Sequence, residues 1–191
     1  MQPNTKKHSS GLGGGLSFGK QIGLFAGVAA VIIAGLAITM SALGPKSSTP
    51  ALISIAQRQQ EIIRVSTEAT KQVSTQNTSN FVANTNATMQ SSQTAVIAYL
   101  ADHGTKLKAK QLALDMNPKT DTLLDNAASA NTYDTAVTQE LTAEIESYQS
   151  LLKTTYDTTT SKSTKKLLEQ NFTAAAALLE QAKSLPTSAA N

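Results

Sequence analysis

Residues 133–152 read YDTAVTQELTAEIESYQSLL, and their apolar positions show the clearest periodicity in the chain. An α-helix turns once every 3.6 residues, so apolar residues spaced three or four apart share one face. The six that do so here are Tyr133, Val137, Leu141, Ile145, Tyr148 and Leu152. This spacing predicts a long amphipathic helix that must bury its apolar face against other helices.

Three further stretches show a similar pattern. The first has apolar residues at Leu52, Ile55, Ile62, Ala69 and Val73, with Gln59 and Ser66 at the intervening seam positions. The second contains Val82, Met89, Val96 and Leu100 and stops near His103-Gly104, where glycine is the expected helix stop. The last places Leu168, Phe172, Ala175, Leu179 and Ala182 on one face and ends at Pro186. These runs predict three more long helices.

The segment between the second and third long runs predicts only short helices, one of them starting at Asn117-Pro118. β-structure has little support, because the chain contains no Asn-Gly or Asp-Gly hairpin signal. We therefore predict an all-α domain over residues 51–186. Its four long helices are expected to form a bundle in a ferritin-like up-down arrangement, with a helical crossover between the second and third.

A second feature precedes this domain. Residues 22–43 carry no charged side chain, and at about 1.5 Å per residue they reach roughly 33 Å, enough to cross a hydrocarbon core of about 30 Å. We predict a transmembrane signal anchor over residues 20–44, in contact with membrane lipid through residues 22–43. A cleaved signal peptide is the alternative, although its apolar region is usually shorter. A type IV pilin leader fits less well, because no acidic residue occurs before Glu61.

The flanking charges predict the orientation of this anchor. Lys6, Lys7 and Lys20 precede it, and only Lys46 follows closely. By the positive-inside rule, residues 1–19 form a disordered cytoplasmic tail. Residues 45–50 then form a linker outside the membrane, followed by the bundle at 51–186 and a short tail at 187–191. The expected location is the cell membrane, with a single pass and an extracytoplasmic domain.

Small residues recur at the start of the predicted span and just before it. Gly19, Gly23 and Gly27 are four residues apart, a spacing that lets two membrane helices approach closely. They are candidates for packing against a second copy of the chain, as a homodimer, or against another envelope protein.

Composition and charge exclude several classes of function. The chain has no cysteine, which excludes a disulfide framework, a thiol nucleophile and any cysteine-held zinc or iron-sulfur site. Residues 45–191 hold 13 basic and 13 acidic side chains, so the expected folded part is neutral. A nucleic-acid-binding module would concentrate positive charge there, so we expect no nucleic-acid partner.

Few residues are candidates for a metal site. A ferritin-like di-iron site needs Glu-x-x-His motifs, and this chain has none. The residues that remain as possible metal ligands are Glu61, Glu68, Glu140, Glu144 and His103. We expect most of them on solvated helix faces. We predict no metal, no cofactor and no catalytic residue. The pair Asp102-His103 is expected to lie at a helix end, where His often caps carbonyl groups.

Glu144 and Tyr148 are the candidates for ligand contact. Glu144 lies beside the apolar stripe of the third long helix, three residues after Leu141. Its carboxylate either contacts a ligand within the bundle or reaches water at the edge of the stripe, and we favour water. The lysines at 106, 108, 110 and 119 are similarly expected on a solvated face, with anionic lipid or wall polymer as the alternative.

Several segments resemble a known family. They are residues 58–65 (RQQEIIRV), residues 100–103 (LADH), the Tyr133-Asp134 start of the third run, and residues 178–182 (LLEQA). Over about residues 55–185 the chain resembles the domain of unknown function 4142 family, whose members are exported, helical and ferritin-like. Members often carry His on the third and fourth helices, where this sequence has Glu144 and an alanine-rich run. The resemblance therefore implies the architecture without a metal role.

These features predict a membrane-anchored cell-envelope protein whose helical bundle has a structural or binding role and no catalytic activity. The alternative is an extracytoplasmic sensor or solute-binding helical module. An enzyme would require an unrecognised carboxylate site. A pocket lined by Glu144 and tyrosines would favour the solute-binding alternative, whereas a filled core favours the structural one.

Overall fold

The computed structural model describes residues 48–185, and every regular element in that range is a helix. The elements are α2 (Thr49–Ala69), α3 (Gln76–Asp102), α4 (Ala109–Leu112), the 3-10 helix η2 (Ala113–Asp115), α5 (Pro118–Ser129), α6 (Tyr133–Thr158) and α7 (Lys162–Lys183). The predicted all-α class is confirmed for this part of the chain. The first long helix begins at Thr49 rather than at residue 51, with Pro50 in its first turn, where proline is compatible with a helix.

The membrane features lie outside the described residues. They are the tail at 1–19, the anchor at 20–44, the glycines at 19, 23 and 27, and linker residues 45–47. Residues 186–191, at the other end of the chain, also lie outside the described residues. Within residues 48–185, no helix combines the length and hydropathy that a membrane span requires.

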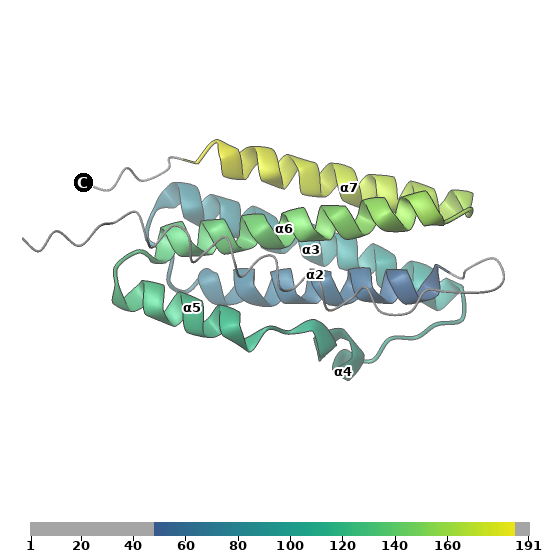
Figure 1. The fold of residues 1–191 in the computed structure, drawn as a ribbon, viewed down its shortest axis with the longest axis horizontal. Coiled ribbons are helices and arrows are strands. Elements are labelled where there is room, and N and C mark those ends of the chain that lie inside the picture. The colour runs from purple at the N-terminus through teal and green to yellow at the C-terminus, as the bar shows by residue number, and fades with distance from the viewer. Residues whose placement is uncertain (1–47, 186–191) are drawn as a thin grey trace, which may run out of the picture. The chain divides into compact units, whose positions relative to one another are not determined.

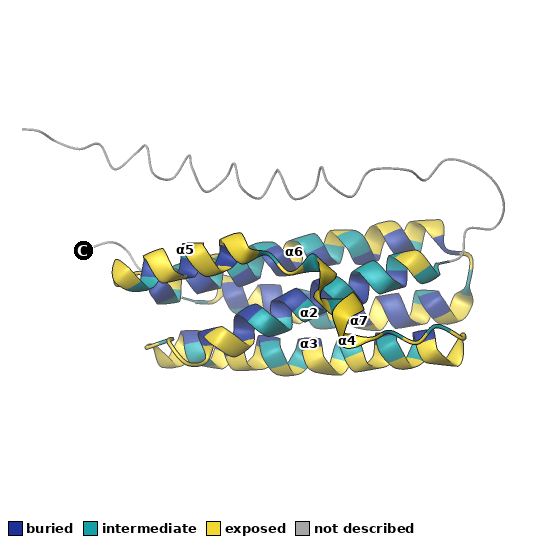
Figure 2. Ribbon diagram, turned by 90° about the horizontal axis from the view of Figure 1, so that it is seen from below, coloured by how far each residue is buried: buried dark blue, intermediate teal, exposed yellow. Residues whose placement is uncertain are grey.

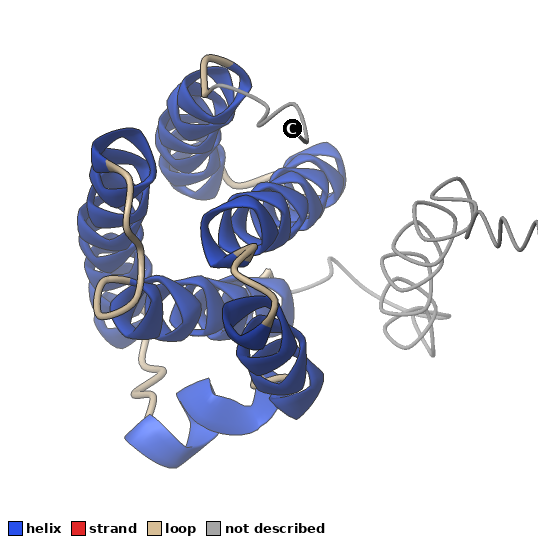
Figure 3. Ribbon diagram, turned by 90° about the vertical axis from the view of Figure 1, so that its left-hand side faces the viewer, coloured by secondary structure: helices blue, strands red, loops and turns tan. Residues whose placement is uncertain are grey.

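Four long helices pack side by side. Helix α2 contacts α3 and α6, and α7 contacts the same two helices, which closes a four-sided bundle (Figure 3). Buried residues lie on the sides of the helices that face one another, as Figure 2 shows. The largest apolar side chains with less than 2% exposure are Tyr148, Phe81, Leu52, Ile55, Ile62, Met89, Leu100, Leu141, Ile145, Leu152 and Leu168. All six apolar positions predicted for residues 133–152 are buried.

Hydrogen bonds between helix ends define the directions of the four helices. At one end the Tyr99 hydroxyl, near the end of α3, is 2.8 Å from the hydroxyl of Thr164, at the start of α7. At the other end the backbone N–H groups just before α3 bond to Asp134, at the start of α6. Therefore α3 and α6 run in the same direction and α7 runs opposite to both, while α2 forms an antiparallel hairpin with α3 (Figure 1).

The two parallel helices α3 and α6 are joined by the crossover, which we define as residues 103–132. It contains α4, η2 and α5 and returns the chain along the outside of α2 and α6. Neither α4 nor η2 has a buried residue, and Leu114 is 76% exposed. Because little apolar surface is buried there, polar contacts hold this part of the crossover, such as the bond from Gln57 Nε2 to the carbonyl of Gln111.

The predicted helix stop at Gly104 is confirmed. Gly104 has φ +81°, a left-handed conformation that glycine adopts without a Cβ penalty. Its N–H bonds to the carbonyl of Ala101, and the N–H of Thr105 bonds to the carbonyl of Leu100 at 2.8 Å. These two bonds form a Schellman motif and satisfy carbonyls that would otherwise lack a partner at the end of α3.

One predicted core position is wrong. Phe172 was expected on the buried face of the last helix, but it is 39% exposed. The preceding residue, Asn171, faces the interior instead and is 3% exposed. The reason is that Asn171 forms hydrogen bonds with side chains of two other helices, which the periodicity of one helix does not reveal.

Asp134 provides a testable contact between helix ends. It accepts hydrogen bonds from the N–H groups of Ser74 at 2.9 Å and Thr75 at 2.7 Å. Burial acts to raise the pKa of this carboxyl, but the hydrogen bonds from Thr75 and Ser74 outweigh burial and lower it below the ordinary 3.8.

Replacing Asp134 with Asn is therefore expected to lower the free energy of unfolding by about 1 kcal/mol at pH 7, because one acceptor oxygen is lost. An acid with a lowered pKa stabilises the fold above its unfolded value and loses that contribution as pH falls through the folded value. Denaturant unfolding of the parent and of Asp134→Asn should thus differ at pH 7 and converge below pH 3.8. A difference that does not depend on pH would contradict this account.

Candidate functional site

Glu144 is buried against an arginine rather than exposed to water. Its residue exposure is 4%, so the expectation that its carboxylate reaches water is wrong. Arg58, on α2, donates from Nη1 to Glu144 Oε2 at 2.7 Å, across 86 residues of sequence. Arg58 Nε lies 3.2 Å from Asp115 Oδ2 in the crossover. The guanidinium therefore connects α2, α6 and the crossover.

Arg58 was not among the residues predicted for a site, although a signal for it exists. It lies three residues after Ile55 and four before Ile62, so it belongs to the same face of α2 as these core residues. An arginine on an apolar face needs an acidic partner, because burying an unpaired charge is costly. The periodicity indicates that a partner is required but not which acid supplies it.

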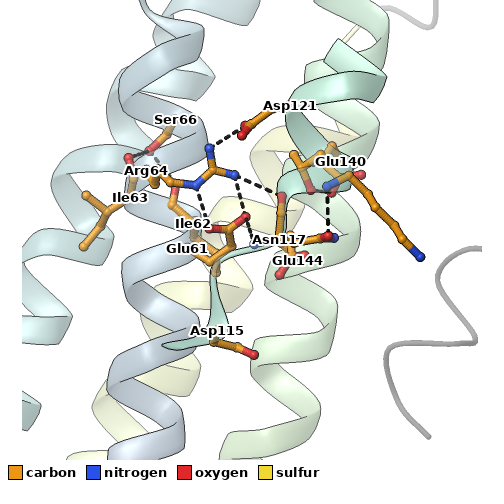
Figure 4. A network of polar contacts seen from close by, with 12 residues as sticks. Glu61, Ile62, Ile63, Arg64, Ser66, Asp115, Asn117, Asp121, Glu140 and Glu144 are labelled. Atoms are coloured by element: carbon orange, nitrogen blue, oxygen red, sulfur yellow. Dashed lines mark hydrogen bonds and ion pairs between the residues drawn. The ribbon is translucent and has the colours of Figure 1, made fainter. Parts of the chain in front are cut away.

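A second arginine cluster lies further along α2, where Arg64 follows Arg58 by nearly two helical turns. Arg64 donates from Nε and Nη2 to the two carboxylate oxygens of Glu61, at 2.8 and 2.7 Å. It also pairs with Asp121 of α5, as Figure 4 shows. The N–H of Asn117 bonds to Glu61 Oε1 at 3.2 Å. Glu61 is fully buried, so the expectation of a solvated face is wrong for this residue as well.

Electrostatics of the two clusters follow from burial and pairing. Burial raises the pKa of Glu144, against the opposing effect of Arg58. Burial also raises the pKa of Asp115, again opposed by Arg58. The pKa of Arg64 is raised, chiefly by its hydrogen bond to Glu61. Both arginines therefore remain charged and neutralise two carboxylates that lie inside the protein.

The remaining candidate metal ligands do not complete a metal site with these clusters. Glu68 is exposed and pairs with Lys71, and Glu140 accepts a hydrogen bond from the Thr120 hydroxyl at 2.9 Å. Across residues 48–185, no group of three His, Asp or Glu side chains is arranged to hold a metal ion. Arg58 and Arg64 instead supply the positive charge beside Glu144 and Glu61.

His103 lies at the end of α3, as predicted. Its ring stacks on that of Tyr99, with 4.1 Å between the centroids, and Nδ1 is 2.7 Å from the carbonyl oxygen of Tyr99. The imidazole therefore contacts a carbonyl in the last turn of α3, which also accepts a hydrogen bond from the backbone N–H of His103 at 3.2 Å. The predicted capping role of this histidine is consistent with these contacts.

Tyr148 lies in a polar layer at the centre of the bundle. Its hydroxyl donates to Asn171 Oδ1 at 2.7 Å and accepts from Gln59 Nε2 at 2.7 Å. Gln59 also donates to Asn171 Oδ1 at 2.9 Å, and Asn171 Nδ2 donates to the carbonyl of Leu167. Burial raises the pKa of Tyr148, so the hydroxyl stays protonated. These three side chains bind one another and leave no polar group of Tyr148 directed at a pocket.

Neither of two surface pockets is lined by Glu144 or Tyr148. One lies between α6 and α7 and includes Tyr156, Glu169 and Phe172. The other lies at the end of the bundle and includes Ser48, His103 and Thr164. The two residues predicted for ligand contact are thus both in the interior, about one helical turn apart on α6, and each bonds to protein side chains.

The polar layer gives a test of hydrogen-bond energetics. Tyr148→Phe is expected to cost about 1 kcal/mol, the usual net value of a neutral hydrogen bond, because Asn171 keeps its bond from Gln59. Gln59→Met should cost less than Tyr148→Phe, because Gln59 Oε1 is buried without a partner among the described residues and its loss relieves a desolvation cost. Urea unfolding of both variants measures the difference. A larger cost for Gln59→Met than for Tyr148→Phe would contradict this account.

Comparison of the chain with protein-family models, with curated proteins and with solved structures finds no match. The resemblance to the domain of unknown function 4142 family therefore stays a prediction.

Proposed function

We propose that this chain is a membrane-anchored cell-envelope protein whose extracytoplasmic helical bundle has a structural or binding role without catalytic activity. The uncharged stretch at residues 22–43 and the basic residues before it support the anchor and its orientation. The observation that carries the role of the bundle is its filled interior. Glu144 and Tyr148, the side chains that could have lined a ligand pocket, are 4% and 0% exposed and bind protein partners.

The filled interior favours this role over the solute-binding alternative. A site for a small molecule is usually a largely preformed concave pocket with a few polar groups directed into it. In this bundle the polar groups at the centre are directed at one another, from Gln59, Tyr148 and Asn171. A solute would have to break these bonds and displace core side chains, both of which cost free energy.

We also propose that the bundle is ferritin-like in architecture and has no metal role. One long crossover between two antiparallel helix pairs is the connection found in ferritin-like folds. The order of directions, with α3 parallel to α6, supports this assignment. In place of metal ligands, Arg58 and Arg64 pair with the buried acids of α2 and α6. The exposed face for a partner would then lie on the outside of the helices.

Protease treatment of intact cells tests the anchored topology. The full chain with a C-terminal epitope is expressed in a bacterial host, and protease is added to spheroplasts. We expect digestion of the bundle and retention of the chain in the membrane fraction after alkaline extraction. Protection of the epitope, or release of a fragment whose N-terminus lies near Gly44, would contradict the proposal.

A further inference from the structure

The two ends of the bundle differ in charge. One end, which we call the basic end, contains the start of α2, the end of α3, the start of the crossover and the α6–α7 turn. Hydrogen bonds place these segments together, because Thr164 is 2.8 Å from Tyr99 and 3.5 Å from Ser48. The opposite end, which we call the acidic end, contains the α2–α3 and α5–α6 turns, where Asp134 bonds to Thr75. It also contains the end of α7, where Asn84 bonds to Gln181.

A layer of contacts halfway along the helices divides the two ends. Gln59, Tyr148 and Asn171 bond to one another at this level, and the pair Arg58 and Asp115 lies beside it. The half toward the basic end comprises residues 48–57, 91–114 and 149–170. The half toward the acidic end comprises residues 60–90, 116–147 and 172–185. Every charged side chain of residues 48–185 except the pair at the dividing level belongs to one of these halves.

The charges of the two halves are opposite in sign. The basic half holds seven lysines, at 106, 108, 110, 153, 162, 165 and 166, against the three acids Asp102, Asp157 and Glu169. The acidic half holds the nine acids Glu61, Glu68, Asp121, Asp125, Asp134, Glu140, Glu144, Glu146 and Glu180 against the four bases Arg64, Lys71, Lys119 and Lys183. The near-neutral domain is therefore an electric dipole along its long axis, with about four excess positive charges in one half and about five excess negative charges in the other.

Five of the seven lysines of the basic half are available to a partner. Lys106, Lys108, Lys110, Lys162 and Lys166 are exposed, and none of them forms an ion pair with another described residue. The acidic half differs, because several of its acids pair with bases of the same half, such as Glu180 with Lys183. Apart from Lys119, the lysines that form no ion pair with a described residue therefore lie in the half near the end at which Thr49 begins α2.

We propose that the basic end docks on an anionic phospholipid membrane surface and holds the bundle upright on it. This inference rests on the proposed membrane anchor. Only residues 44–47 separate the predicted span from Ser48, and a chain extends at most about 3.5 Å per residue. Ser48, at the basic end, thus stays within roughly 20 Å of the lipid, and an anionic surface attracts the lysines of this end and repels the acidic half.

Lipid is the occupant that these features favour over a soluble acidic polymer or an acidic protein. The short tether keeps the membrane surface at a high effective concentration beside the lysines, whereas a soluble partner would have to compete with it. Each lysine close to an anionic leaflet contributes about a fivefold change in an equilibrium constant. Several free lysines together therefore suffice to orient the bundle.

The test uses the full chain reconstituted in vesicles of phosphatidylcholine alone or mixed with phosphatidylglycerol. The chain has no cysteine, so a single fluorophore can be attached at Thr160→Cys, in the α6–α7 turn, or at Gln72→Cys, in the α2–α3 turn. Energy transfer to a lipid-borne acceptor reports the distance from the surface. We expect Thr160→Cys to approach the surface more closely in phosphatidylglycerol vesicles, and this difference to disappear in 1 M salt, where the Debye length is about 3 Å. Gln72→Cys should remain distant in both.

Two matched triple variants separate local from overall charge. Replacement of Lys106, Lys162 and Lys166 with Gln is expected to lower the contact equilibrium of the basic end at least about tenfold. Replacement of Lys71, Lys119 and Lys183 with Gln removes the same charge from the acidic half and should not weaken contact. Equal effects of the two triples, or no dependence on lipid composition, would overturn the inference.

Two further outcomes identify which proposal fails. Extraction of the full chain from the vesicles by alkali would overturn the anchored function, and with it the tether that this inference needs. Retention in the vesicles without a preference for phosphatidylglycerol overturns the inference alone. If soluble polyglutamate binds the basic end and phosphatidylglycerol does not, the partner is an acidic polymer and the lipid assignment is wrong.

Discussion

Replacing Arg58 with Met is expected to lower the free energy of unfolding by about 3–5 kcal/mol at pH 7, the usual cost of removing one partner of a buried ion pair. The variant leaves the Glu144 carboxylate in the interior without the guanidinium that lies 2.7 Å away in the parent. Met has a similar unbranched shape, so the loss reports the charge rather than a cavity. Chemical denaturation at pH 7 measures it.

The loss of unfolding free energy caused by Arg58→Met should be smaller at mildly acidic pH. Burial already raises the pKa of Glu144 above its ordinary value of 4.5, and without Arg58 nothing described opposes that effect. An acid whose pKa is raised in the folded state destabilises the fold at pH values above that pKa. Protonation of the acid removes this destabilisation as the pH falls through the raised pKa. The difference between the parent and Arg58→Met is therefore expected to be smaller at pH 5 than at pH 7.

Two controls accompany this variant. In the double variant Arg58→Met/Glu144→Leu, both charges are gone, so its stability should return to that of the parent or exceed it by about 1–4 kcal/mol. Lys153→Met breaks an ion pair with Asp157 whose side chains are 69% and 55% exposed, and it should cost less than about 1 kcal/mol. A double variant as unstable as Arg58→Met would show that the pair contributes more than charge compensation.

Leu141→Ala is expected to cost about 2–5 kcal/mol, because it leaves a cavity that neighbouring side chains fill only partly. Leu141 is fully buried between Val137 and Ile145 on α6. The matched control is Leu114→Ala, at a position in the crossover that is 76% exposed, where we expect a change within about 0.5 kcal/mol. Thermal melts with and without a strong chelator should give the same ranking. A drop in the melting temperature of the parent with chelator would contradict a fold that needs no metal.

Periodicity predicted the helices better than it predicted their polar residues. The third run was placed correctly because its apolar residues all lie on one face of the helix, and their spacing in the sequence is enough to show this. Gln59 and Ser66, placed on the seam of α2 by spacing alone, are both fully buried. The expectations for Glu61 and Glu144 failed because we assumed that charged side chains on these helices face solvent. Arg58, on the apolar face of α2, was the signal that a buried acid must pair with it.

The sequence by itself determined the helical class, the helix stop at Gly104, the helix start at Asn117 and the neutrality of the domain, because these follow from local geometry and from counting. The tertiary structure alone decided that Arg58 meets Glu144 across 86 residues and that Asn171 rather than Phe172 faces the interior. It also decided that the lysines gather at one end. Each of these depends on which helices are neighbours and in which direction they run, and a helix's own spacing carries no information about its partners.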